Sequence, residues 1–364
     1  MIETFIFISM VLSLVSIFFK INLGAKKKIA YCFLFLIVFF DGLRWETGTD
    51  WKTYYDGYQN LLDGFQPGFE IGFSFYSFII RSLTDNYSLF LFITTFIIYF
   101  GIYIPILKLT NFSFTSLFFL TAHVPWYSGS LRQMLATVFF CHSLKYIHDR
   151  KLFKFVITLI FGATFHSTIV PFIFTYWVYG ASFYAFLFLA LIIVGSSAII
   201  SYLINFIDII INLINPGKSI EGRIKSSVEF SNPYLGILRK FLTLLLSYFS
   251  SNNFISYEII KVNDDEIKLK FYLFLSYFSL IFYIVGTFFI EHVSSRLDIY
   301  TGIICLSILF GLIEKNIFNK KKMYLLFFIV ALLCYVNYTR LMYMDLFHPY
   351  KSIFYNTDYL RDLE

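Results

Sequence analysis

Residues 29–58 read IAYCFLFLIVFFDGLRWETGTDWKTYYDGY. The first part, Ile29 to Phe40, is an uninterrupted apolar run. The charged residues that follow it stand among aromatic residues and glycines: Asp41, Arg44, Glu46, Asp50, Lys52 and Asp56. Charged groups at the end of a membrane-length apolar segment are costly unless they meet partners or a charged ligand. The stretch therefore predicts either a polar loop that ends a membrane helix or a binding site at the membrane surface.

The whole chain is unusually apolar. Of its 364 residues, 58% are hydrophobic, 22% are aromatic and only 14% are charged, whereas soluble domains carry about 25% charged residues. Apolar stretches of about 18 to 22 residues recur along the sequence, which is the length that crosses a bilayer as a helix. We therefore predict an all-α fold, a polytopic transmembrane helical bundle that forms a single integral membrane domain over residues 1–364.

The lysines between the apolar runs predict the orientation. Lys20 and Lys26 to Lys28 follow the first run, so that loop is expected in the cytoplasm and the N-terminus outside. Continued along the chain, this rule gives about 12 spans (roughly 10–13) with both termini on the outer, periplasmic side. Residues 44–86 then form an outer loop with an interfacial or re-entrant helix over 68–83, and residues 201–232 form the largest outer loop. Residues 152–179 form either one tilted span or a hairpin that turns near His166, and the hairpin gives the later loops the expected sign.

This topology places eight of the nine arginines on the outer side. They are Arg44, Arg81, Arg132, Arg223, Arg239, Arg296, Arg340 and Arg361. Arginine is costly near hydrocarbon, but its planar fork binds phosphate or carboxylate through two parallel hydrogen bonds. The asymmetry favours an anionic ligand at the outer face, and snorkelling interface arginines are the alternative.

Other classes of site have little support. The basic residues are not interleaved with aromatic residues as on nucleic-acid surfaces, so we expect no nucleic-acid partner. The four cysteines are unpaired in apolar runs and predict neither a metal nor a redox centre. The acidic cluster Asp264 to Glu266 lies between lysines and is expected to be a solvated cytoplasmic loop.

Six short motifs then stand out in order along almost the whole chain. They are Arg44 with Gly48-Thr49-Asp50 and Tyr54-Tyr55; Phe69-Glu70-Ile71-Gly72-Phe73; Leu131-Arg132-Gln133; Phe165-His166-Ser167; Ser295-Arg296 with Tyr300; and His348-Pro349-Tyr350-Lys351-Ser352. In this order and spacing they resemble the motifs of EpsG-like proteins, which are grouped with the Wzy-type polysaccharide polymerases.

The resemblance implies a GT-C-like glycosyltransferase of the bacterial inner membrane with its active face in the periplasm. Such an enzyme transfers a growing glycan from undecaprenyl diphosphate to the non-reducing end of a new lipid-linked repeat unit. It uses no nucleotide sugar, and neither a metal nor another cofactor is expected. The expected partners are undecaprenyl-diphosphate-linked glycans, membrane lipid, and a chain-length regulator and flippase of the same pathway. The product is an O-antigen, a capsule or an exopolysaccharide.

The reaction assigns roles to particular residues. Fixed cations stabilise a departing diphosphate, and Arg132 is the first candidate because it occupies the first turn of a helix that begins after Ser130, where the helix dipole also attracts anions. Arg44 and Arg296 are its expected partners. The candidates for the general base are Asp50, Glu46, Glu70 and His166, and the sequence leaves the choice open. The candidates for substrate binding are Gln133, Tyr54, Tyr55 and Tyr300. Alternatively, Asp50 holds the Gly48 turn, His166 is a packing residue and the tyrosines belong to an interfacial belt.

Two other functions fit part of the pattern. An O-antigen ligase acts on the same lipid carrier and uses the same arginine chemistry, but such enzymes usually carry a longer outer loop. A lipid-linked oligosaccharide transporter or flippase performs no chemistry, and transporters tend to place charges and broken helices at mid-membrane in paired halves. The outer-rim charges and the lack of internal symmetry favour the polymerase.

Overall fold

The computed structural model describes residues 2–48, 50–63, 68–179, 264–289, 296–316 and 351–353. The regular elements in these ranges are helical, apart from one isolated antiparallel bridge between Arg44 and Ser352, which confirms the all-α fold class. The chain divides into two units, Met1–Tyr176 with Ser307–Glu364 and Trp177–Leu306, and each is described by itself. The expected outer loop over 201–232 lies outside the described residues.

Up to residue 178 the described helices follow one another with short connections, and three further helical elements are described from residue 264 onward. They are α1 (Ile2–Phe18), α2 (Leu23–Gly42), α3 (Trp51–Gln59), the 3₁₀ turn η1 (Leu61–Asp63), α4 (Ile71–Arg81), α5 (Tyr87–Leu109), α6 (Phe114–His123), the 3₁₀ turn η2 (Val124–Tyr127), α7 (Leu131–His148), α8 (Leu152–Phe165), the 3₁₀ helix η3 (Ser167–Phe174), α9 (Thr175–Val178), α13 (Asp264–Phe289), the π-helical η4 (Ile299–Ile304) and α15 (Cys305–Asn316).

The core of the first unit is built around α6. Every residue from Phe114 to Ala122 is buried, so this short helix is surrounded by protein rather than lipid. It packs against α1, where the Ser13 and Thr115 hydroxyls are 3.0 Å apart. Around it, α5 packs on α2 and α7, and α7 packs on α8. Because neighbouring helices cover it on every side, α6 needs no polar face toward solvent.

The segment 152–179 is a hairpin, as the charge pattern predicted. Helix α8 ends at Phe165, and His166 adopts an extended conformation before η3 runs back. At the far end of the hairpin, Tyr176 returns to the start of α8, where its carbonyl accepts a hydrogen bond from Arg150 Nη1 at 2.9 Å. The Arg150 guanidinium lies 4.5 Å from the centre of the Tyr176 ring. His166 therefore lies at the turn, at the opposite end of α8 from Arg150.

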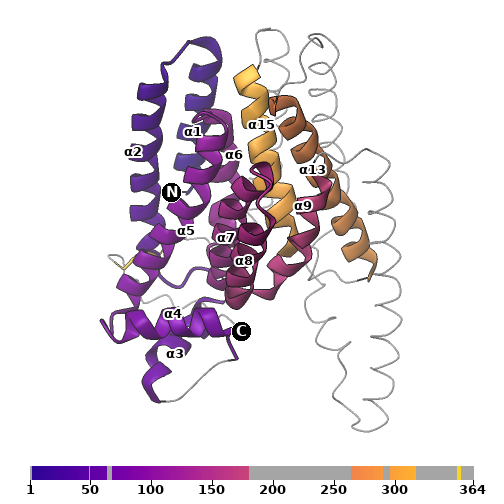
Figure 1. Cartoon of the computed structure of the whole chain (residues 1–364). Helices are drawn as coiled ribbons and strands as arrows, with labels where there is room; N and C mark the ends of the chain where they lie inside the picture. Colours follow the sequence, from indigo (N-terminus) through magenta and orange to yellow (C-terminus); the bar gives the residue numbers. More distant parts are fainter. Residues whose placement is uncertain are drawn as a thin grey trace. The chain divides into compact units, whose positions relative to one another are not determined.

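The short helices α3 and α4 lie together at one end of the first unit, away from the turn that joins α1 to α2 (Figure 1). Helix α4 confirms that 68–83 contains a helix separate from the longer ones. One side of α4 is buried through Phe73 and Ser77, while Ile71 and Phe75 on another side are 76% and 64% exposed. This division is typical of a helix that lies in a membrane interface, and the interfacial location of α4 remains a prediction.

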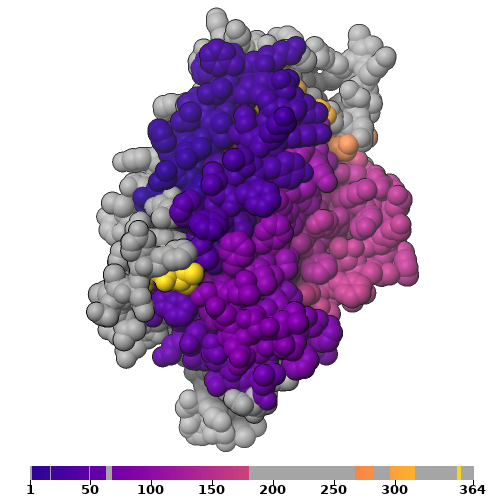
Figure 2. Space-filling model, turned by 90° about the vertical axis from the view of Figure 1, so that its left-hand side faces the viewer, coloured from indigo at the N-terminus to yellow at the C-terminus, as the bar shows by residue number. Residues whose placement is uncertain are grey.

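Two of the described helical stretches, Tyr87–Leu109 and Arg296–Lys315, are long and apolar enough to cross a membrane. Large apolar side chains are also exposed on α1, α2 and α8, among them Phe7, Phe35 and Phe153. Figure 2 shows one face of the chain on which α1 and α2 carry part of this surface. Exposed apolar surface on this scale is typical of lipid contact. The count of 12 spans and the periplasmic termini remain predictions.

Candidate functional site

The candidate site is centred on an ion pair between Glu70 and Arg132. Glu70 immediately precedes α4, Arg132 is in the first turn of α7, and the carboxylate Oε2 lies 2.6 Å from the guanidinium Nη1. The guanidinium also lies 4.8 Å from the centre of the Phe69 ring, a cation–π distance. The two side chains are 25% and 23% exposed, so the pair is accessible from outside. The Arg132 guanidinium is therefore within reach of an external anion.

His166 is the third member of the site. Its Nδ1 lies 3.8 Å from Glu70 Oε1, beyond hydrogen-bonding distance, and accepts a hydrogen bond from the Thr168 amide at 3.3 Å. A nitrogen that accepts carries no proton, so this bond assigns the proton of the neutral ring to Nε2. Glu70 thus lies between a cation and an imidazole, with one carboxylate oxygen toward each.

Glycine at position 72 allows Glu70 to reach His166. A Cβ built on Gly72 would lie 2.2 Å from Thr164 Oγ1 and 2.8 Å from the Thr164 carbonyl oxygen. Helix α4 therefore crosses the end of α8 in direct backbone contact, two residues before His166. The Glu-x-Gly motif thus combines a candidate carboxylate with the close approach that places it.

Tyr54 adds a phenol to the site from α3. Arg132 Nε donates to its hydroxyl at 3.4 Å, a long hydrogen bond. Burial raises the pKa of Tyr54, the Arg132 guanidinium lowers it, and the charge of Asp50 raises it. The net direction is upward, so the phenol is protonated at neutral pH. Since its oxygen faces Arg132, its proton is available to another acceptor.

The loop that carries Gly48 meets the start of α7 through a second glycine contact. Gly48 has a φ of +96°, and a Cβ built there would lie 2.6 Å from the Cα of Gly129. Only glycine tolerates both conditions. The contact brings the loop before α3 against the residues that precede Arg132, and Asp50 occupies the position before the first residue of α3.

Ser130 lies at the start of α7 as predicted, but its hydroxyl does not cap the helix. Its side chain forms no cap hydrogen bond; its carbonyl oxygen instead accepts from the Met134 amide at 3.0 Å. Helix α7 therefore begins through backbone bonding and its contact with the loop rather than through a hydroxyl cap. Arg132 still occupies the first turn, where the helix dipole favours an anion.

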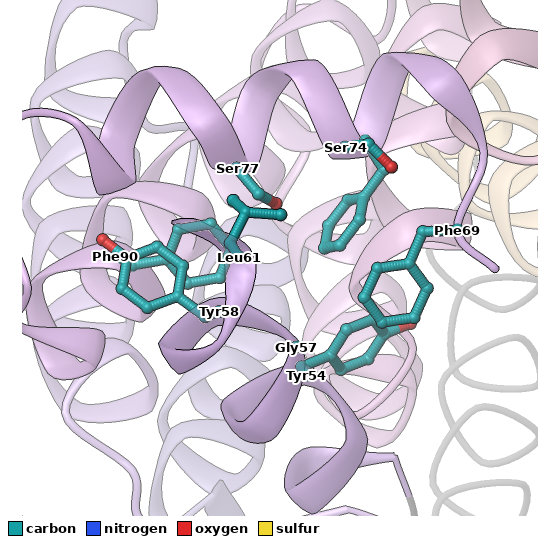
Figure 3. Close-up of a pocket in the computed structure, with 9 residues that line it drawn as sticks. Tyr54, Gly57, Tyr58, Leu61, Phe69, Ser74, Ser77 and Phe90 are labelled. Atoms are coloured by element: carbon teal, nitrogen blue, oxygen red, sulfur yellow. The ribbon is translucent and has the colours of Figure 1, made fainter. Parts of the chain in front are cut away.

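A small cavity of about 10 Å³ lies beneath α4, next to the site. Its lining residues are Tyr54, Gly57, Tyr58, Leu61, Phe69, Phe73, Ser74, Ser77 and Phe90 (Figure 3). That volume matches about one water molecule and excludes a sugar ring.

Arg44 is placed differently from Arg132. Its side chain is 2% exposed, and Nη1 donates to the Asp41 carbonyl, the Asp41 carboxylate and Thr95, at 2.8, 3.1 and 3.1 Å. Nη2 donates to the Ser128 carbonyl at 2.7 Å. The side chain joins α2 to α5 and to the loop that precedes α7. In this structure Arg44 serves as a framework residue, and its predicted contact with diphosphate would require these bonds to break.

Glu46 also binds within the protein. Its carboxylate lies 2.7 Å from Lys351 Nζ, and its backbone φ is +46°. Among the four candidate bases, Glu70 and His166 are therefore brought together with Arg132, Asp50 lies nearby through Tyr54, and Glu46 is paired with Lys351.

The remaining predicted residues fall into three settings. Gln133 is buried beside Arg132. Tyr55 stacks on Trp51 with ring centres 5.0 Å apart. Arg296 and Tyr300 belong to the second unit, where η4 buries Tyr300 and packs against α13. The proximity of Arg296 and Tyr300 to Arg132 therefore remains a prediction.

Three residues of the site had no role assigned from the sequence: Phe69, Gly129 and Lys351. Phe69 and Lys351 lie inside the recognised motifs, and Gly129 is one residue before the cap position of α7. Their motif positions were a usable signal, but the contacts that give them a role are long-range. Within the described residues, no group of three His, Cys, Asp or Glu side chains could hold a metal ion.

A family model, described as the EpsG family, matches residues 27–352 of this chain. The match spans all six motifs, from Arg44 to Ser352. No curated protein and no solved structure matches the chain.

Proposed function

Because the chain belongs to the EpsG family, whose members have a polysaccharide polymerase-type function, we propose that it polymerises undecaprenyl-diphosphate-linked repeat units at the outer face of a bacterial inner membrane. The observation that supports this most directly is the accessible Glu70–Arg132 pair with His166 beside it. A metal-independent transfer from a lipid diphosphate needs a fixed cation for the leaving group and a base for the attacking hydroxyl. These three side chains supply both.

Arg132 is proposed to bind the diphosphate. Its guanidinium already holds a carboxylate at 2.6 Å, and a diphosphate offers paired oxygen acceptors with more charge. The lipid diphosphate would therefore displace Glu70 from Arg132. As the glycosidic bond to the diphosphate breaks, negative charge grows on the departing oxygen, and a fixed guanidinium stabilises that charge.

Glu70 is proposed to be the base. Once the diphosphate has taken its cation, the carboxylate is left beside His166 with its oxygens no longer bound to Arg132. A new bond forms between the acceptor hydroxyl oxygen and the donor's anomeric carbon. The bond from that carbon to the diphosphate oxygen breaks with its electron pair, and the hydroxyl proton moves to Glu70. The freed carboxylate stays next to the His166 ring, whose Nδ1 lies 3.8 Å from Oε1.

Complementation of a strain that lacks the gene tests the proposal. Deletion should leave glycan of a single repeat unit on the cell surface, and the wild-type gene should restore the ladder of longer chains. Loss of all glycan from its terminal acceptor, with the lipid-linked polymer still made, would instead identify a ligase. Accumulation of the lipid-linked unit on the cytoplasmic side would identify a flippase.

A further inference from the structure

The segment 351–353 is fastened to the loop that follows α2. The Trp45 amide donates to the Lys351 carbonyl at 3.0 Å, and the Ile353 amide donates to the Leu43 carbonyl at 3.1 Å. Together with the bridge between Arg44 and Ser352, these bonds make a short antiparallel pairing between residues about 300 positions apart. Figure 2 shows residues 351–353 in yellow against the first part of the chain. We call this pairing of 43–46 with 351–353 the clasp.

A nearly buried ion pair closes the clasp. Lys351 Nζ lies 2.7 Å from Glu46 Oε2, and the two side chains are only 4% and 15% exposed. Glu46 has a left-handed backbone, which is strained for a residue with a side chain. The Lys351 ammonium offsets that strain by binding the carboxylate in this conformation. Removing it would leave a buried carboxylate without this cation.

The clasp leads directly into the site. Two residues after Glu46, Gly48 packs on the Cα of Gly129, just before α7 begins. The chain then enters α3, where Tyr54 receives a hydrogen bond from Arg132. The backbone of 43–46 thus sets where the Gly48 loop meets the start of α7. A shift of the backbone at Glu46 would therefore move either the contact between Gly48 and Gly129 or the side chain of Tyr54.

We propose that Lys351 is a positioning residue for the Arg132 site. By binding Glu46 it fixes the loop that places Tyr54 and Gly129 around Arg132. This inference rests on the proposed function, because the activity that Lys351 supports is the proposed polymerisation. It adds residues 351–353 to the segments that shape the site. Loss of the Lys351 charge should lower turnover about 10- to 100-fold, as expected for a misplaced catalytic group.

The test compares Lys351→Met and Lys351→Arg with the wild type. The substrate is the lipid-linked unit that accumulates in the deletion strain, presented to membranes with equal amounts of each protein. Lys351→Met should lower kcat with little change in KM, and Lys351→Arg should recover most of the loss. Wild-type kcat per molecule for Lys351→Met would overturn the inference.

Lys26→Met is the matched control. Lys26 forms another nearly buried Lys–Glu pair, with Glu314 at 2.9 Å. It lies in the first turn of α2, at the end of that helix away from the clasp. Lys26→Met should lower the amount of folded protein but should not change the kcat of the folded molecules that remain. If Lys26→Met and Lys351→Met lowered kcat per molecule equally, Lys351 would have only a general structural role, and the inference would be wrong.

Hydrogen–deuterium exchange of the purified protein separates this inference from the proposed function. In Lys351→Met, exchange should rise in residues 43–50, because the Trp45 amide loses a fixed acceptor, while the interior of α5 should be unchanged. Unchanged exchange in residues 43–50 would refute the positioning role of Lys351, whether or not the protein is a polymerase. If the wild-type gene failed to restore glycan chains, the polymerase proposal would be refuted. The exchange result would still decide whether Lys351 fixes residues 43–50.

Discussion

Replacing Arg132 with alanine gives the sharpest test of the proposed site, because its expected effects on stability and on activity differ widely. In the folded protein Arg132 holds Glu70 at 2.6 Å and lies over Phe69. Both members of the ion pair are about a quarter exposed, so solvent screens their attraction. Such a pair contributes about 1 kcal/mol or less to stability, and the ring contact adds about 0.5–1 kcal/mol.

The effect on catalysis should be larger. A fixed donor that stabilises charge in the transition state is worth roughly 3–4 kcal/mol, or about 10²- to 10³-fold in rate. Arg132→Ala should therefore remove the ladder of long glycan chains while the protein remains in the membrane near its normal amount. Arg132→Lys keeps the charge but loses the planar fork, and it should recover only part of the activity.

Arg150→Ala is the matched control for Arg132→Ala. Arg150 also combines a hydrogen bond, 2.9 Å from the Tyr176 carbonyl, with a cation–π contact, but it lies at the opposite end of α8 from His166. Its removal should cost similar stability without shortening the glycan. The assay is a gel of surface glycan alongside an immunoblot of the membrane fraction. A full-length ladder from Arg132→Ala, or equal shortening by both variants, would refute the role assigned to Arg132.

Three further outcomes follow from particular contacts. Gly72→Ala should lower activity at least tenfold, since its Cβ cannot fit beside the Thr164 carbonyl oxygen, whereas Gly24→Ala, which meets only a side-chain oxygen at 3.4 Å, should leave the glycan ladder intact. Because burial raises the pKa of Tyr54, the folded state holds this proton more tightly than the unfolded chain. The free energy of unfolding should then fall as the pH rises above 10, and thermal melts of Tyr54→Phe should show a shallower fall. Glu314→Ala should reduce the amount of folded protein, because about 3–5 kcal/mol is typical when one member of a buried pair is lost; a normal melting temperature would contradict this.

Much of the fold could be predicted because its signals are local. Apolar runs gave the helical class, and the charge pattern gave the hairpin between Arg150 and Tyr176 with its turn at His166. Helix α7 starts after Ser130 as expected, although the hydroxyl does not cap it. These features depend on residues near one another in sequence, whose preferences can be added along the chain.

The partners of the charged residues could not be predicted in the same way. Arg44 and Arg132 carry the same charge at the same expected end of the bundle, yet one is buried against backbone carbonyls and the other faces an accessible carboxylate. The difference arises from Ser128 and Glu70, each tens of residues away from the arginine it binds. Glu46 was an equally good candidate base until Lys351, 305 positions away, proved to be its partner. Burial and pairing are properties of the packed chain.

Glycine contacts bring together motifs that lie far apart in the sequence. Gly48 touches Gly129, and Gly72 touches Thr164, so each contact joins one recognised motif to the neighbourhood of another. At both points a single Cβ would push the two backbones apart. Nearby polar side chains, such as Glu70 two residues before Gly72, would then be displaced from their partners. A weak Gly-containing motif can therefore be as informative as a charged one. In the proposed site the charged residues are assigned the chemistry, while the glycine contacts determine which charges meet.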